Sequence, residues 1–174
     1  MRHCYNILCF AIAATVQSPT VRADAPLAPP ARQELCSPSG SYCVVLNPGS
    51  SAQAFHVFPD GRREFVWSVP GWHRYPLVLD DGEHFISDCQ SLLVPDSPSV
   101  DPEYVLLTVY YRGNVTTQVR LREVLANIHS LQPTSSHVTW GRCAGVTPMG
   151  ELILKTVEKR MLFLNINTGE LVWR

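Results

Sequence analysis

The chain has 174 residues, of which 45% are hydrophobic and 17% are charged, and its formal net charge is −1. This length suits one domain preceded by a leader segment. The nearly balanced charge excludes the basic surface that nucleic-acid binding requires.

The first residues have the pattern of a secretory signal peptide. A short basic start, Met1-Arg2-His3, precedes a mainly apolar run at residues 4–16, and residues 21–23 read Val-Arg-Ala. The apolar run is too short to span a bilayer, which takes about 20 residues, but it fits the core of a signal peptide followed by a small-residue cleavage site. We therefore predict a signal peptide at residues 1–23, cut after Ala23. An N-terminal anchor or a buried strand is the alternative interpretation.

Residues 24–34 are rich in Pro and Ala, which predicts a flexible leader before a domain at residues 35–174. Loss of Arg2 and Arg22 with the signal leaves 12 Lys and Arg against 15 Asp and Glu, a net charge of −3. No later apolar run is long enough to cross a membrane. We expect a periplasmic or secreted protein that binds neither nucleic acid nor, after cleavage, a membrane.

Four cysteines follow the signal, and an even number in an exported protein predicts two disulfides. Three pairings are possible. The turn at residues 37–40 favours Cys36–Cys43, and Cys89–Cys143 then follows by elimination. A metal site is the rival interpretation, but the spacings match no zinc module and no Cys-x-x-Cys pair is present. No cofactor is predicted.

Three segments of the chain share one plan of a glycine turn, two strands, a second glycine turn and a closing strand. The glycine-to-glycine spacings are 21, 31 and 19 residues, and the longest belongs to the segment with the Pro-rich insertion at residues 95–102. The predicted strands are residues 41–46, 54–58 and 64–68, then 84–89, 104–111 and 117–121, then 151–157, 161–166 and 170–173. Between the second and third segments, the spacing of Leu121, Val124, Leu125 and Ile128 predicts one short amphipathic helix.

The turns Ser37-Pro38-Ser39-Gly40, Asp60-Gly61-Arg62 and Asn167-Thr168-Gly169-Glu170, with Trp67 and Trp173 in closing strands, resemble the blade motifs of β-propeller (WD40-like) proteins. The resemblance covers about residues 37–174. It implies an all-β fold of three consecutive antiparallel sheets, a partial β-propeller with one short helix. Propellers close with four to eight blades, and this chain has three such units. A β-sandwich is the alternative fold.

An arc of three sheets would leave strand edges and sheet faces uncovered, and uncovered edges recruit other chains. We therefore expect either a second copy, which would give a ring of six units, or a foreign protein on the concave face.

Trp72, His73 and Arg74 form the densest recognition-like cluster, since Trp and Arg are favoured interface anchors. Local packing between two units is the competing interpretation. Ser136 and His137 invite a nucleophile–base interpretation, and they lie in one of two loops, residues 95–102 and 132–137, where binding is expected.

A second polar cluster consists of Asp80, Asp81, Glu83, His84 and Asp88, and it reads either as a metal site or as a solvated turn. Residues 114–116 (Asn-Val-Thr) form a glycosylation sequon in a predicted hairpin turn.

The leading functional prediction is an exported, non-catalytic protein-interaction module that binds through its concave face and loops. Size, signal peptide, disulfides and turns also resemble those of exported immunity proteins that block a secreted cell-wall hydrolase toxin. A hydrolase is the third prediction, with Asp81, His84 and His137 as its candidate catalytic residues.

Overall fold

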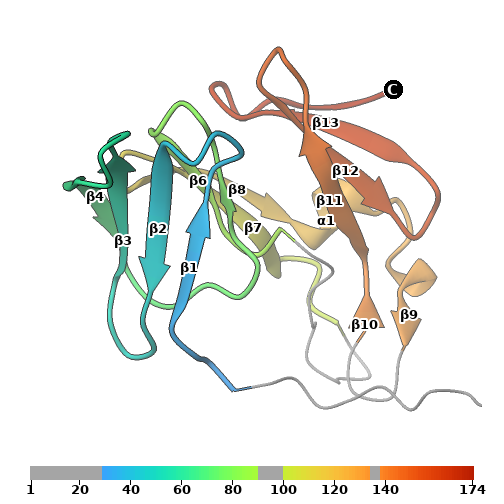
Figure 1. The fold of residues 1–174 in the computed structure, drawn as a ribbon. Coiled ribbons are helices and arrows are strands. Elements are labelled where there is room, and N and C mark those ends of the chain that lie inside the picture. The colour runs from blue at the N-terminus through green and yellow to red at the C-terminus, as the bar shows by residue number, and fades with distance from the viewer. Residues whose placement is uncertain (1–28, 90–99, 134–137) are drawn as a thin grey trace, which may run out of the picture.

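Three four-stranded antiparallel sheets follow one another along the chain in the computed structural model, which describes residues 29–89, 100–133 and 138–174. Each sheet is built from four consecutive strands, so no strand crosses from one sheet to another. Figure 1 shows the first, second and third sheets side by side, in chain order. This arrangement confirms the prediction of an all-β protein with three consecutive antiparallel sheets, and it differs from the two facing sheets of a sandwich.

The first sheet begins with a disulfide-linked hairpin. Its strands are β1 (Gln33–Cys36), β2 (Tyr42–Leu46), β3 (Ala52–Val57) and β4 (Arg63–Val69). Cys36 and Cys43 lie opposite each other across β1 and β2 and form the predicted disulfide. Strand β1 also takes in Gln33 and Glu34, so the sheet begins two residues before the predicted domain boundary at 35.

The second sheet is buried on both faces along its inner strands. Its strands are β5 (Leu77–Val78), β6 (His84–Ile86), β7 (Val105–Tyr111) and β8 (Asn114–Arg120). Phe85 packs with Val44, Ala54 and Trp67 of the first sheet, whereas its neighbour Ile86 belongs to a core shared with the third sheet. Since successive side chains of a strand point to opposite faces, this continuous burial places β6 between two other layers.

The third sheet turns a row of leucines toward the second sheet. Its strands are β11 (Gly141–Val146), β12 (Glu151–Thr156), β13 (Met161–Asn165) and β14 (Leu171–Trp173). Leu152, Leu154, Leu162 and Leu164 are fully buried, in one cluster with Val109 of the second sheet. The Cys89–Cys143 disulfide joins the second and third sheets, and Cys143 N donates to Cys89 O at 3.0 Å. Both predicted disulfides are therefore present.

Between the second and third sheets the chain forms α1 (Leu121–Val124), the 3-10 helix η1 (Ile128–Ser130) and a small ladder of β9 (Gln132–Pro133) with β10 (Val138–Thr139). The predicted continuous helix through Ile128 is wrong at its centre. The Glu158 carboxylate accepts the N–H groups of Ala126 (3.1 Å) and Asn127 (2.8 Å), so these groups leave the helical pattern. The same contacts tie this segment to the turn between β12 and β13.

The innermost strands β1, β5 and β11 are not predicted from the sequence, which indicates three strands for each unit. The predicted signal peptide at residues 1–23 lies outside the described residues.

Candidate functional site

The predicted recognition cluster Trp72, His73 and Arg74 lies in the link between β4 and β5. The Trp72 ring is half-buried against the core between the first two sheets, and its Nε1 donates to Ala31 O at 2.9 Å. The Arg74 guanidinium carbon lies 5.1 Å from the centre of the Trp72 ring. This aromatic–cation pair covers the junction of two sheets.

His73 is held by its own chain. Its ring centre lies 5.2 Å from that of Phe85 and 5.9 Å from that of Tyr110, and its Nε2 is 3.0 Å from Pro70 O. Arg74 N donates to Asp88 Oδ1 at 3.3 Å. The cluster therefore contributes internal packing, and binding by its members stays a prediction. Ser136 and His137 lie outside the described residues.

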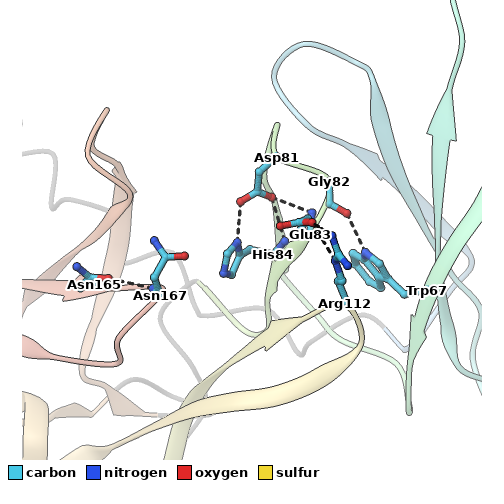
Figure 2. A network of polar contacts seen from close by, with 8 residues as sticks. All are labelled: Trp67, Asp81, Gly82, Glu83, His84, Arg112, Asn165 and Asn167. Carbon is cyan, nitrogen blue, oxygen red and sulfur yellow. Dashed lines mark hydrogen bonds and ion pairs between the residues drawn. The ribbon is translucent and has the colours of Figure 1, made fainter.

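The acidic turn before β6 brings Asp81 and His84 together, as Figure 2 shows. Asp81 Oδ1 accepts the backbone N–H groups of Glu83 (2.9 Å) and His84 (3.0 Å), and Asp81 Oδ2 lies 2.6 Å from His84 Nδ1. Two other acidic residues of the predicted cluster lie apart: Asp80 accepts Ser39 N of the first sheet at 2.9 Å, and Asp88 accepts Arg74 N.

Burial raises the pKa of Asp81, but the two backbone N–H groups and the His84 imidazole more than compensate, so that its pKa is lowered. An ionised carboxylate only accepts hydrogen bonds, so His84 Nδ1 is the donor. His84 Nδ1 is engaged by Asp81, so Nε2 is the ring nitrogen that could accept a proton; His84 is 5% exposed. This pair has the geometry of a base with its orienting group.

A second ion pair, between Glu83 and Arg112, lies beside this one (Figure 2), with Arg112 Nε 2.9 Å from Glu83 Oε1. The hydrogen bond lowers the pKa of the Glu83 carboxyl. On the first-sheet side, Trp67 Nε1 donates to Gly82 O at 2.8 Å, which connects β4 to the acidic turn.

A cleft of about 340 Å³ separates this turn from the third sheet, and Asn167 lies on its far side (Figure 2). The lining residues are Asp81, Glu83, His84, Tyr111, Thr116, Ile166 and Asn167. The Thr116 hydroxyl, the one aliphatic hydroxyl in this lining, donates to Val109 O at 3.2 Å. The cleft therefore presents an imidazole, two carboxylates and an amide, but its aliphatic hydroxyl is already bonded to the backbone.

A different cleft, of about 240 Å³, lies where the innermost strands of the three sheets approach one another. We call it the inner cleft. It is lined by Gln33, Leu35, Tyr75, Pro76, Leu77, Cys89, Cys143 and Gly145. Tyr75 is 40% exposed, so part of its ring is available to a partner. The described lining residues are mainly apolar, with Gln33 as the one amide side chain, and none of them is Asp, Glu, His, Lys or Arg.

One group of potential metal ligands occurs in the described part of the chain, Glu34 with Cys36 and Cys43. It is unsuited to a metal because both sulfurs are in the disulfide and Glu34 is paired with Arg63 at 2.6 Å. The two disulfides indicate an oxidising compartment outside the cytoplasm. None of the described helices has the length and apolar character that a membrane span needs.

Comparisons of this chain with protein family models, with curated proteins and with solved structures find no match.

Proposed function

We propose that this protein is an exported, non-catalytic interaction module, periplasmic or secreted, that binds a protein partner at the inner cleft. The observation that carries the proposal is the position and chemistry of this cleft. Strands from all three sheets meet there, and its walls are Leu35, Leu77, Pro76 and the Cys89–Cys143 disulfide. A concave apolar surface held by rigid strands suits an inserted apolar side chain.

The chemistry of the inner cleft, compared with that of the Asp81–His84 cleft, supports binding rather than catalysis. The inner cleft offers no acid or base among its described lining residues, and Tyr75 at its surface is the type of residue that dominates interface energetics. The partner class that follows is a protein with an exposed aliphatic or aromatic side chain. The predicted inhibitor of a secreted cell-wall hydrolase is one protein of this kind.

The test is a pull-down from the exported fraction with the wild type, Tyr75→Ala and Val115→Ala. Val115 is an exposed apolar residue of β8, 55% accessible, and is outside the inner-cleft lining, so it controls for general surface effects. Recovery of one partner by the wild type and Val115→Ala, with loss by Tyr75→Ala, supports the proposal. Equal recovery by all three contradicts it. A cell-wall hydrolase as the partner would identify an inhibitor.

Export itself is tested by N-terminal sequencing of the purified protein. Cleavage after Ala23 gives Asp24 as the first residue. An intact Met1 on protein recovered from the host would contradict the export proposal.

A hydrolase is the second candidate, and the Asp81–His84 pair is the observation that favours it. His84 Nε2 would accept the proton of a nucleophile or a water. Hydrolysis by the wild type that is lost in His84→Gln and kept in His129→Gln, an exposed histidine of η1, would support this function. Activity that survives His84→Gln would remove it.

A further inference from the structure

At two places in the fold, a glycine turn of one sheet packs against the outermost strand of the preceding sheet. The β7–β8 turn of the second sheet places Gly113 against β4 of the first, so closely that a Cβ on Gly113 would lie 2.4 Å from Ser68 O. The β13–β14 turn of the third sheet places Gly169 against β8 of the second, and a Cβ there would lie 2.6 Å from Thr117 Oγ1. Both glycines have positive φ, +81° and +74°. We call this arrangement the tip contact.

At each end of the row of three sheets, only one of the two partners of the tip contact is present. In the first sheet, the corresponding β3–β4 turn carries Gly61 at φ +83°, and a Cβ built there meets no atom within 4 Å. In the third sheet, none of the described turn glycines approaches β14 as Gly113 approaches β4. Within the described residues, the Gly61 turn of the first sheet therefore has no strand to contact, and β14 of the third sheet has no glycine turn packed against it.

The outer faces of the two end sheets carry apolar side chains, and that of the third sheet also carries the exposed Lys155. On the first sheet, Val45 and Phe55 alternate with core residues and so lie on the outer face. Phe65 joins them because a register shift between β3 and β4 places it opposite Phe55; Phe65 is 54% exposed, and its ring centre is 6.1 Å from that of Phe55. On the third sheet, Phe163 and Val172 lie opposite each other on the outer face and are half-buried.

Each outer face also carries an ion pair between residues of its own sheet. Glu34 and Arg63 lie at 2.6 Å on the first sheet, and Glu151 and Arg174 at 2.7 Å on the third. The Arg174 guanidinium carbon is 4.7 Å from the centre of the Phe163 ring. Glu34 also lies 4.0 Å from Arg32. Because each carboxylate is paired with an arginine of its own chain, neither would be buried as an unpaired anion if the faces meet.

We propose that a second copy of this chain completes the tip contact: the Gly61 turn of each copy docks on β14 of the other. The first sheet of one copy then follows the third sheet of its partner, so that the spacing and order of the sheets continue across the boundary. Two such contacts related by a two-fold axis close a dimer of six sheets. The proposal does not depend on the inner cleft, since its surfaces lie at the outer ends of the array.

The test compares Gly61→Asn with Gly49→Asn by light scattering after size exclusion, over a concentration series. Gly49, in the β2–β3 turn, is the matched control because it too has positive φ (+78°) and open space around its Cβ position. Asn tolerates left-handed backbone, so both variants should fold. In the dimer, however, the Gly61 turn lies against β14, and the added side chain would keep it away.

We expect a dimer of twice the monomer mass for the wild type and Gly49→Asn. The dimer dissociation constant of Gly61→Asn should be about tenfold higher or more. Phe65→Glu, which changes an exposed side chain, gives a second disrupting variant if Gly61→Asn folds poorly. A monomeric wild type, an open polymer, or a dimer equally strong in both glycine variants would overturn the proposal. Dimerisation unchanged in Tyr75→Ala would separate this result from partner binding.

Discussion

Removal of each disulfide tests how the sheets are held together. Cys36 and Cys43 are 7 residues apart within one hairpin, whereas Cys89 and Cys143 are 54 residues apart and join two sheets. In the chain-entropy description, a cross-link stabilises by restricting the unfolded chain, and the effect grows with loop length. The lost stability is about 2 kcal/mol for the short loop and about 4 kcal/mol for the long one.

The variants are the double substitutions Cys36→Ala with Cys43→Ala, and Cys89→Ala with Cys143→Ala. The free energy of unfolding is measured by urea titration at constant pH, with fluorescence and circular dichroism as independent probes of a two-state transition. We expect the second variant to be the less stable by about 2 kcal/mol, the difference between the two loop terms. Equal losses, or a larger loss for the hairpin disulfide, would refute the loop-length reasoning.

Two further substitutions probe the junctions around the second sheet. Trp67→Phe removes the indole donor to Gly82 O and leaves a carbonyl without its partner, so urea titration should show a loss of about 1–3 kcal/mol; no loss would mean that water replaces the donor. Because the pKa of Asp81 is lowered in the folded protein, its contribution to stability is present above the unfolded value near 3.8 and is lost as pH falls through the folded value. Asp81→Asn should therefore make stability less dependent on pH below about pH 5 than in the wild type. Identical pH profiles for the wild type and Asp81→Asn would contradict the linkage.

Local patterns in the sequence were sufficient for the outer parts of each sheet. Glycine turns such as Gly61 and Gly169 mark hairpins because positive φ is cheap only for glycine, and the strands around them are rich in β-formers. The innermost strands lacked these signals. Strand β5 has two residues, β11 contains Gly141 and Gly145, and β1 begins in a Pro- and Ala-rich segment. Their pairing with a neighbouring strand, rather than their own composition, makes them strands.

Trp67 and Trp173, both predicted in closing strands, have different environments in the fold. Trp67 is opposite Ala54, faces the second sheet and is 6% exposed. Trp173 is opposite Leu162, on the leucine face of the third sheet at its outer strand, and is 42% exposed beneath the Arg160 guanidinium. The first and third sheets pack against opposite faces of the second sheet. The closing-strand tryptophans of the first and third sheets therefore have different neighbours, although both follow a glycine turn.

The polar network was predictable only in part. Asp81 and His84 are three residues apart, so the turn itself brings them together. The Glu83–Arg112 pair joins residues 29 positions apart, and its formation depends on the pairing of β6 with β7. His73 is predicted as a recognition residue from the sequence, but in the fold it is half-buried against the rings of Phe85 and Tyr110.

The consecutive order of the strands has a consequence for oxidative maturation. The Cys36 and Cys43 thiols face each other as soon as a single hairpin closes, so their oxidation can occur while the rest of the chain is still unfolded. The Cys89 and Cys143 thiols meet only when the second and third sheets have docked. The redox state of Cys89 and Cys143 therefore reports whether the second and third sheets have docked. A thiol-trapping experiment should first detect an intermediate that has the Cys36–Cys43 disulfide and two free thiols, Cys89 and Cys143.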